Sequence, residues 1–153
     1  MENKEQVTIL LAEDDDGHAR LIQDLFKNAG VYNPVTRFRN GQEAWDFVSG
    51  AARPCLDKDK QYLMLLDIRM PVLDGVEVLR RLKLDERFKN IPVIMLTTTD
   101  DPREIERCYA LGCNCYLTKP VEFEGFTEVI RRLGLFIMVI KVTPALGRKG
   151  EAK

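Results

Sequence analysis

The chain has 153 residues, of which 45% are hydrophobic and 31% are charged, so it holds enough apolar material for one globular domain and too little for a second. Its formal net charge is −1 with both signs interspersed, which argues against the positive surface that nucleic acid or an anionic membrane requires. The longest apolar run, residues 135–140, is far shorter than the ~20 residues of a membrane-spanning helix, and no signal-peptide pattern is present, so we expect a cytoplasmic protein.

Short apolar segments alternate with segments of helical spacing along the chain. The apolar segments predict β-strands at residues 7–12, 35–38, 62–66, 92–96 and 115–117. Helical stripes lie between them, for example Leu21, Ile22, Leu25, Phe26 and Ala29 after the first strand, and Val76, Val78, Leu79 and Leu82 after the third. Such alternation predicts an α/β fold, a doubly wound parallel sheet of five strands covered by helices on both faces.

Local signals support these boundaries. Asn40 is a candidate N-cap for the second helix, and Asp101 followed by Pro102 and Glu104 predicts the start of the fourth. Residues 50–61 form the one long irregular connection. We predict one folded domain over residues 1–142 and a polar tail over residues 143–153. The four cysteines form no CxxC pair and are expected to be buried, reduced thiols.

Acidic residues, a threonine and a lysine follow four of the predicted strands at their carboxyl ends. Glu13 and Asp14 follow the first strand, Asp67 the third, Thr97 the fourth, and Lys119 the fifth. Ligands of open parallel sheets bind beyond these ends, near the point where the strand order reverses. Carboxylates from two strand ends repel each other unless a cation lies between them, and Mg²⁺ prefers such oxygen ligands.

The residue types at this edge have chemically distinct uses. Asp67 is the candidate nucleophile, because a carboxylate attacks phosphorus without losing a proton first and forms an acyl phosphate. Asp14 and Asp67, with Glu13 in support, would bind Mg²⁺. Lys119 and the hydroxyl of Thr97 would contact oxygens of the transferring phosphoryl group.

The segments ILLAEDD, LLDIRMPVLDG, IPVIMLTT and CYLTKP, in this order, resemble the receiver domains of two-component signalling from about residue 8 to residue 140. The resemblance implies a flavodoxin-like fold with strand order 2-1-3-4-5, Asp67 as phosphoacceptor, and Glu13 and Asp14 as the acidic pair. It further implies Thr97 and Tyr116 as switch residues, Lys119 as the phosphate-contacting lysine, and the backbone carbonyl of Arg69 as a metal ligand. A cis peptide bond between Lys119 and Pro120 is also implied.

Two positions depart from the usual receiver pattern. Glu13 stands where many receivers carry aspartate, so its carboxylate reaches one methylene further and is expected to contact the metal through water. Thr98 stands where alanine or glycine is common, which predicts narrower access to the phosphoryl group and an altered rate of dephosphorylation.

Several residues also have a simpler interpretation. Residues 14–16 could serve merely to cap the first helix and to favour its start electrostatically. Asp67 could be merely a turn aspartate, and Lys119 merely a solvated lysine. The last helix has a stripe predicted to face the core, made of Phe126, Val129, Ile130, Leu133, Phe136, Ile137 and Ile140. Apolar residues outside this stripe predict a second contact, a homodimer formed through this helix: Leu135, Met138, Val139 and Val142.

Two other functions compete with the phosphoreceiver. A haloacid-dehalogenase-like phosphatase would use Asp14 within the Asp14–Gly17 run, but this leaves Asp67 without a role and the chain has little room for a cap domain. A degenerate receiver would bind partners without phosphorylation, yet every expected site residue is present. We therefore expect no enzyme acting on other substrates, and only Mg²⁺-dependent phosphorylation and dephosphorylation of the chain itself.

The resemblance implies a histidine kinase or a phosphorelay protein as phosphoryl donor, and output through protein contacts. Glu13, the irregular segment before Tyr62 and the segment LTTTDDPREIERCYALGCNCYLTKPVEF resemble the small receivers that partner bacterial phytochrome kinases. Light sensing would belong to the kinase, since the chain has no indication of a chromophore site.

Overall fold

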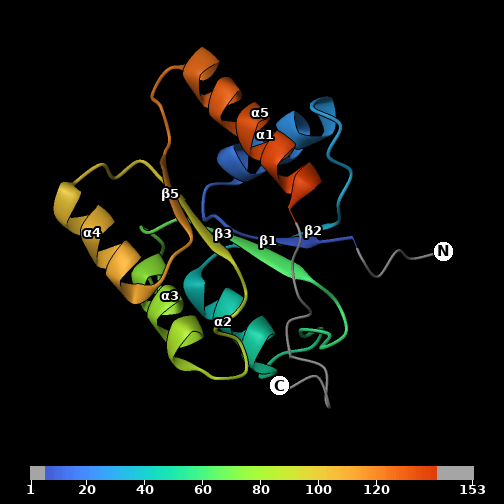
Figure 1. Cartoon of the computed structure of the whole chain (residues 1–153), viewed down its shortest axis with the longest axis vertical. Helices are drawn as coiled ribbons and strands as arrows, with labels where there is room; N and C mark the ends of the chain where they lie inside the picture. Colours follow the sequence, from blue (N-terminus) through green and yellow to red (C-terminus); the bar gives the residue numbers. More distant parts are fainter. Residues whose placement is uncertain (1–5, 141–153) are drawn as a thin grey trace.

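The computed structural model describes residues 6–140, and Figure 1 shows them as a sheet with helices on both faces. Strand and helix alternate throughout: β1 Thr8–Ala12, α1 Asp16–Asn28, β2 Val35–Phe38, α2 Gly41–Ser49, β3 Tyr62–Leu66, α3 Gly75–Leu84, β4 Val93–Thr97, α4 Pro102–Leu111, β5 Cys115–Thr118 and α5 Phe123–Val139. The strands are all parallel, in the order β2-β1-β3-β4-β5. The predicted fold class is confirmed, with each strand within one residue of its expected bounds.

The two faces of the sheet bury different side chains because successive residues of a strand point to opposite sides. Ile9 and Leu11 of β1 pack with α1 and α5, whereas Leu10 and Ala12 pack with α2 and α3. Figure 1 shows α1 and α5 together on one side and α2, α3 and α4 on the other. The strands β3 and β4 are buried at every residue, which is why they are apolar without alternation.

Side-chain caps fix the starts of four helices, α1 to α4. Asn40 accepts a hydrogen bond from the Glu43 N–H (2.8 Å), and Asp101 accepts one from the Arg103 N–H (3.0 Å), with Pro102 in the first turn. Both predicted caps are confirmed. Asp15 caps α1 by accepting a hydrogen bond from the His18 N–H (2.9 Å). Each cap satisfies a backbone donor that the helix leaves unpaired.

Residues 50–61 form the expected irregular connection between α2 and β3. The Leu56 N–H donates to the Phe47 carbonyl, and the Asp57 N–H donates to the Tyr62 hydroxyl (2.9 Å), so both halves of the connection are tied to neighbouring elements. Of the four cysteines, Cys108 and Cys113 are buried and Cys55 and Cys115 are half-buried, so the expected burial holds for two of them. All four are free thiols.

Two expectations are wrong. Among residues 6–140 the cis peptide bond is Arg53–Pro54, and Lys119–Pro120 is trans, the isomer that X–Pro bonds favour by about 0.5–1 kcal/mol unless their surroundings select cis. Phe136 was expected in the core stripe of α5 but is exposed. The buried stripe runs through Phe126, Ile130, Leu133 and Ile137, and at 3.6 residues per turn Phe136 lies roughly a quarter-turn away from it.

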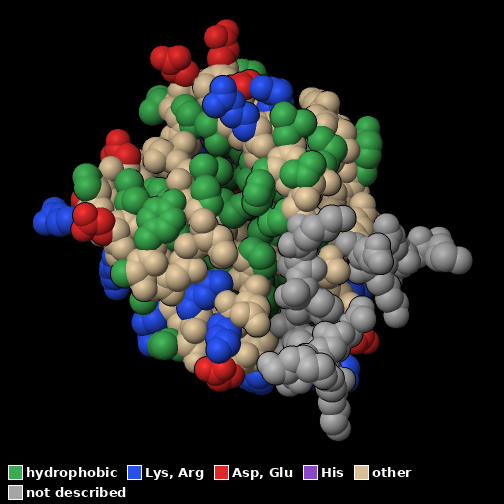
Figure 2. Space-filling view, in the orientation of Figure 1, with side chains coloured by type: hydrophobic (Ala, Val, Ile, Leu, Met, Phe, Trp, Pro, Cys, Tyr) green, Lys and Arg blue, Asp and Glu red, His purple; other side chains and the backbone are tan. Residues whose placement is uncertain are grey.

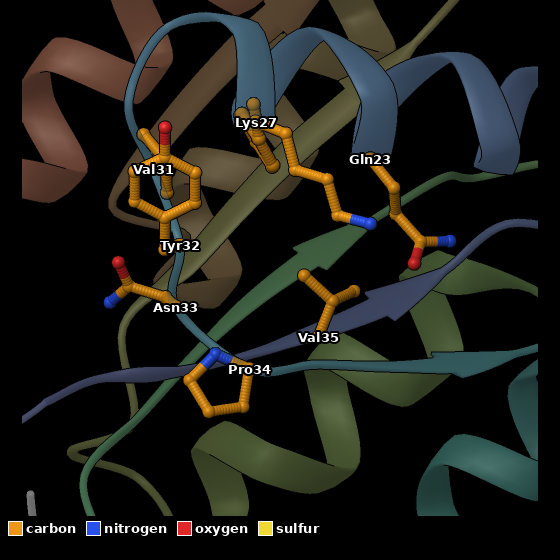
Figure 3. Close-up of a pocket in the computed structure, with 8 residues that line it drawn as sticks. Gln23, Lys27, Val31, Tyr32, Asn33, Pro34 and Val35 are labelled. Atoms are coloured by element: carbon orange, nitrogen blue, oxygen red, sulfur yellow. The ribbon is translucent and has the colours of Figure 1, made fainter.

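A hollow of about 310 Å³ lies between the end of α1 and the start of β2. Figure 3 shows Gln23 and Lys27 extending from α1 over Pro34 and Val35. No carboxylate, histidine or cysteine lines it, and it lies at the amino-terminal edge of the sheet, opposite the edge where the predicted site residues follow the strands. In the described part of the chain, no helix combines the length and apolar character needed to cross a membrane.

Val72, in the loop between β3 and α3, adopts a left-handed backbone conformation with φ of 71° and is 78% exposed. A β-branched residue in this region is strained by about 1–2 kcal/mol, whereas asparagine tolerates it. We expect Val72→Asn to raise the free energy of unfolding by about 1 kcal/mol, measured by urea denaturation. The exposed Val121 is the control, since Val121→Asn relieves no positive φ and should stay within about 0.5 kcal/mol of the parent. Equal changes in the two variants would contradict this explanation.

Candidate functional site

Asp67 lies directly after β3, at the centre of the carboxyl edge of the sheet. Its N–H donates to the Ala12 carbonyl (3.1 Å), which continues the β1–β3 ladder by one residue. Its Oδ1 accepts a hydrogen bond from the Ile68 N–H (2.7 Å), and its Oδ2 lies 3.2 Å from the Lys119 ammonium. The carboxylate is therefore held at both oxygens, while its side chain keeps access to solvent.

Glu13 and Asp14 follow β1, the neighbour of β3 in the sheet. One carboxylate oxygen from each of Glu13, Asp14 and Asp67 lies within 4.8 Å of the other two. Glu13 is buried, Asp67 is half-buried and Asp14 is exposed, so the cluster opens outward on the side of Asp14. Burial raises the pKa of the Glu13 carboxyl, although Lys119 acts in the opposite direction.

Lys119 follows β5 and reaches across the edge of the sheet to this cluster. Its ammonium forms ion pairs with Glu13 and with Asp67, and the side chain is buried beneath them. Its N–H donates to the Thr97 carbonyl (2.7 Å), which extends the β4–β5 ladder and fixes the backbone from which the side chain starts. The simpler reading of Lys119 as a solvated surface lysine does not fit this burial.

The charges at this edge do not cancel. Three carboxylates contribute −3 and Lys119 contributes +1, which leaves −2 in one small region. Hard oxygen ligands with two excess negative charges suit a divalent cation such as Mg²⁺, which binds one or two carboxylates and keeps several waters. The open side at Asp14 leaves room for those waters, so the residues present fit the metal.

Thr97 and Tyr116 are connected through Thr99. The buried Thr97 Oγ1 accepts a long hydrogen bond from the Thr99 N–H (3.5 Å), and the Tyr116 hydroxyl donates to the Thr99 carbonyl (2.6 Å). Burial raises the pKa of Tyr116 to about 12, so this hydroxyl keeps its proton at neutral pH. The two predicted switch residues thus bind the N–H and the carbonyl of the same residue, Thr99.

The remaining predicted residues lie at the rim. Arg69 is exposed, and its Nε is 3.4 Å from the Thr99 hydroxyl. A metal bond from its carbonyl stays a prediction. Thr98 is exposed, and its effect on access to the phosphoryl group stays a prediction. Asp15 is the cap of α1, as the simpler interpretation expects, and Asp16 in the first turn pairs with Arg37 (2.6 Å). Of the three aspartates, Asp14 is the one that belongs to the cluster.

Gly75 is a residue of the site that sequence reasoning missed. A Cβ atom at this position would lie 1.9 Å from the Asp67 carbonyl oxygen, and the Gly75 N–H donates to the Ile68 carbonyl (2.8 Å). The start of α3 therefore packs directly against the backbone of Asp67, the candidate nucleophile. The Asp74–Gly75 pair indicates a turn in sequence, but nothing in that signal shows which backbone the glycine approaches.

The chain matches the model of the response regulator receiver domain family over residues 9–131. It is 31% identical to the response regulator Rcp1 of Synechocystis over 137 residues, which cover 90% of this chain and 92% of the relative. The Mn²⁺-bound structure of Rcp1 superposes with a TM-score of 0.80 at 28% identity, over 89% of this chain and 98% of that one.

Two further solved structures resemble the whole described fold. A receiver domain from Rhodospirillum rubrum has a TM-score of 0.84 at 42% identity and covers 93% of this chain and 100% of its own. The phosphorylated cyanobacterial phytochrome response regulator RcpA has a TM-score of 0.77 at 32% identity and covers 88% and 95%. Both similarities extend well beyond the site itself.

We expect Gly75→Ala to lower the free energy of unfolding by about 1–3 kcal/mol, because the new methyl group must displace the Asp67 backbone. It should also weaken Mg²⁺ binding by the folded protein, measured by calorimetric titration. Gly134→Ala is the matched control, since a Cβ there would meet only side-chain atoms, the nearest of them 3.1 Å away on Val31. Undiminished Mg²⁺ affinity in a folded Gly75→Ala variant would show that this glycine does not position the site.

Proposed function

The chain belongs to the response regulator receiver domain family, and on this premise we propose that it accepts a phosphoryl group on Asp67 with the help of Mg²⁺. Receiver domains take part in two-component signalling with histidine kinases or phosphotransfer proteins. The observation that carries the assignment to Asp67 is the convergence of Glu13, Asp14 and Lys119, from two other strand ends, on its carboxylate.

In the proposed reaction a carboxylate oxygen of Asp67 attacks the phosphorus of a phosphohistidine. The O–P bond forms as the N–P bond breaks, and the released imidazole nitrogen takes up a proton from solvent. Lys119 already lies 3.2 Å from the Asp67 Oδ2, so its ammonium can contact an oxygen of the incoming group. Mg²⁺ held by Asp14 and Asp67, with Glu13 in support, would offset charge on that group.

The buried hydroxyl of Thr97 can donate a hydrogen bond to a second phosphoryl oxygen. Its present contact with the Thr99 N–H is long and is easily exchanged for a charge-assisted one. Since the Tyr116 hydroxyl is bound to the Thr99 carbonyl, a shift of Thr97 and Thr99 changes the partner of Tyr116. This would favour a second packed state in which Tyr116 is more buried, and so alter the surface around β4, α4 and β5.

The phosphatase alternative gains no support. Its Asp-x-Asp signature would require the Asp16 carboxylate to be free for proton transfer beside Asp14, whereas that carboxylate is bound to Arg37. A receiver that binds partners without phosphorylation would not need the acidic cluster and its buried lysine. Self-dephosphorylation of Asp67 is the only hydrolytic activity that we propose.

The narrower proposal is a phytochrome-type histidine kinase as phosphoryl donor. It is supported by the likeness to RcpA and by the sequence features around Glu13 and Tyr62.

Phosphorylation can be tested with Mg²⁺ and a small acyl phosphodonor. We expect mass spectrometry of the intact protein to show the addition of one phosphoryl group, and Asp67→Asn or metal chelation to abolish it. Asp101→Asn is the control, because asparagine still caps α4 and the site is untouched. Labelling that persists in Asp67→Asn would reject the assignment, and labelling mapped to Asp14 would revive the phosphatase alternative.

A homodimer formed through α5 is the second part of the proposal. Four apolar residues in the last two turns of this helix are exposed, Leu135, Phe136, Met138 and Val139, and Figure 2 shows hydrophobic side chains gathered over α5. Val142, which the sequence adds to this set, lies outside the described residues. We propose that a second copy of the chain covers this patch. A two-fold axis that passes through the patch pairs it with the same patch of the second copy.

We expect the wild type to sediment as a dimer at micromolar concentration and Met138→Glu to sediment as a monomer with unchanged stability, since this side chain is already exposed. Leu84→Glu, at an exposed position on α3, is the control and should remain dimeric. A wild type that stays monomeric at high concentration, with and without phosphodonor, would rule out this interface.

A further inference from the structure

Arg37 connects the edge strand β2 to the acidic turn, by which we mean residues 13–16. Its guanidinium donates twice to the Glu13 carbonyl, from Nε (2.9 Å) and from Nη2 (2.7 Å). It donates a third time, from Nη1, to the Asp16 carboxylate (2.6 Å). The half-buried Arg37 side chain thereby binds both the first and the last residue of the acidic turn.

The Glu13 carbonyl belongs to the peptide group that joins Glu13 to Asp14. Because that group is planar, holding its oxygen in place also fixes the direction in which the chain enters Asp14. Within residues 6–140 the Asp14 carboxylate has no hydrogen bond or ion pair with another side chain, in contrast to Glu13 and Asp67. The placement of Asp14 in the cluster therefore depends on its backbone.

We propose that Arg37 is a positioning residue of the metal site, which holds the Glu13–Asp14 peptide so that the exposed Asp14 carboxylate faces Asp67. This rests on the proposed function, since it assumes that the acidic cluster binds Mg²⁺. Arginine suits the task because its planar group presents several donors in fixed directions, whereas lysine offers a single flexible ammonium. The pairing with Asp16 offsets the positive charge that the arginine brings toward a cation site.

The charge of Arg37 makes the proposal sharply testable. By Coulomb's law alone, removing a cation beside a metal site strengthens the binding of Mg²⁺. Loss of a positioning contact has the opposite sign, and residues that support metal ligands typically contribute tenfold to a hundredfold in affinity. A role confined to attaching β2 to α1 would lower the melting temperature without weakening Mg²⁺ binding.

The experiment is a calorimetric titration of the full chain with Mg²⁺, for the wild type and for Arg37→Met, Arg37→Lys and Asp16→Asn. We expect Arg37→Met to raise the Kd for Mg²⁺ at least about tenfold, and Arg37→Lys, which keeps the charge and loses the paired donors, to raise it as well. Asp16→Asn leaves both contacts to the Glu13 carbonyl intact and should stay within about fivefold of the wild type.

A double-mutant cycle with Asp14→Asn then tests the route of the effect. If Arg37 acts through Asp14, Arg37→Met adds little to the loss of Mg²⁺ affinity already caused by Asp14→Asn. Mg²⁺ binding as tight as or tighter than that of the wild type, in a folded Arg37→Met or Arg37→Lys, would overturn the positioning role and leave the metal site standing. A wild type without affinity for Mg²⁺ would instead overturn the proposed function, and this inference with it.

Should Arg37→Met fail to fold, Arg37→Lys decides alone, because it keeps the charge and a long aliphatic stem.

Discussion

The ammonium of Lys119 is buried between the carboxylates of Glu13 and Asp67, and the rest of the site is arranged around this contact. A buried lysine is tolerated only where acids pair with it, and buried acids only where a cation does the same. Because Asp14 adds a further carboxylate on the open side, the cluster carries more negative charge than Lys119 can offset. The same imbalance that makes this edge costly in the unmodified protein also makes it receptive to a divalent ion.

The apolar sheet holds the charged residues of this cluster in place. Glu13 and Asp67 each stand one residue beyond a buried strand, and Lys119 stands one residue beyond the edge strand β5. Main-chain hydrogen bonds to the neighbouring strands fix the backbones of all three residues. Similar contacts extend outward from the cluster. Thr99 is held by both Thr97 and Tyr116, and the start of α3 rests on Asp67 through Gly75. Through these contacts the backbone around Asp67 adjoins α3, and Thr97 and Tyr116 adjoin the loop that leads to α4.

The strands, their order and the main site residues could be predicted because they follow from local apolar segments and from the rule that ligands meet strand ends. Other features depend on contacts between distant segments, which a pattern does not contain. Arg37 looks like any charged residue of an edge strand, and Gly75 looks like any turn glycine, until the backbone that each approaches is known. The trans peptide at Lys119–Pro120 and the exposed Phe136 show the same limit, since isomer and helix rotation are selected by the surroundings.

The long connection over residues 50–61 lies at the amino-terminal edge of the sheet, between the end of α2 and the start of β3. Every residue of the charged cluster lies at the other edge, so the two regions are separated by the full length of the buried strands. The chain thus has a natural attachment point for a fluorescent or affinity label. A probe fused there lies at the opposite edge of the sheet from the acidic cluster of Glu13, Asp14 and Asp67.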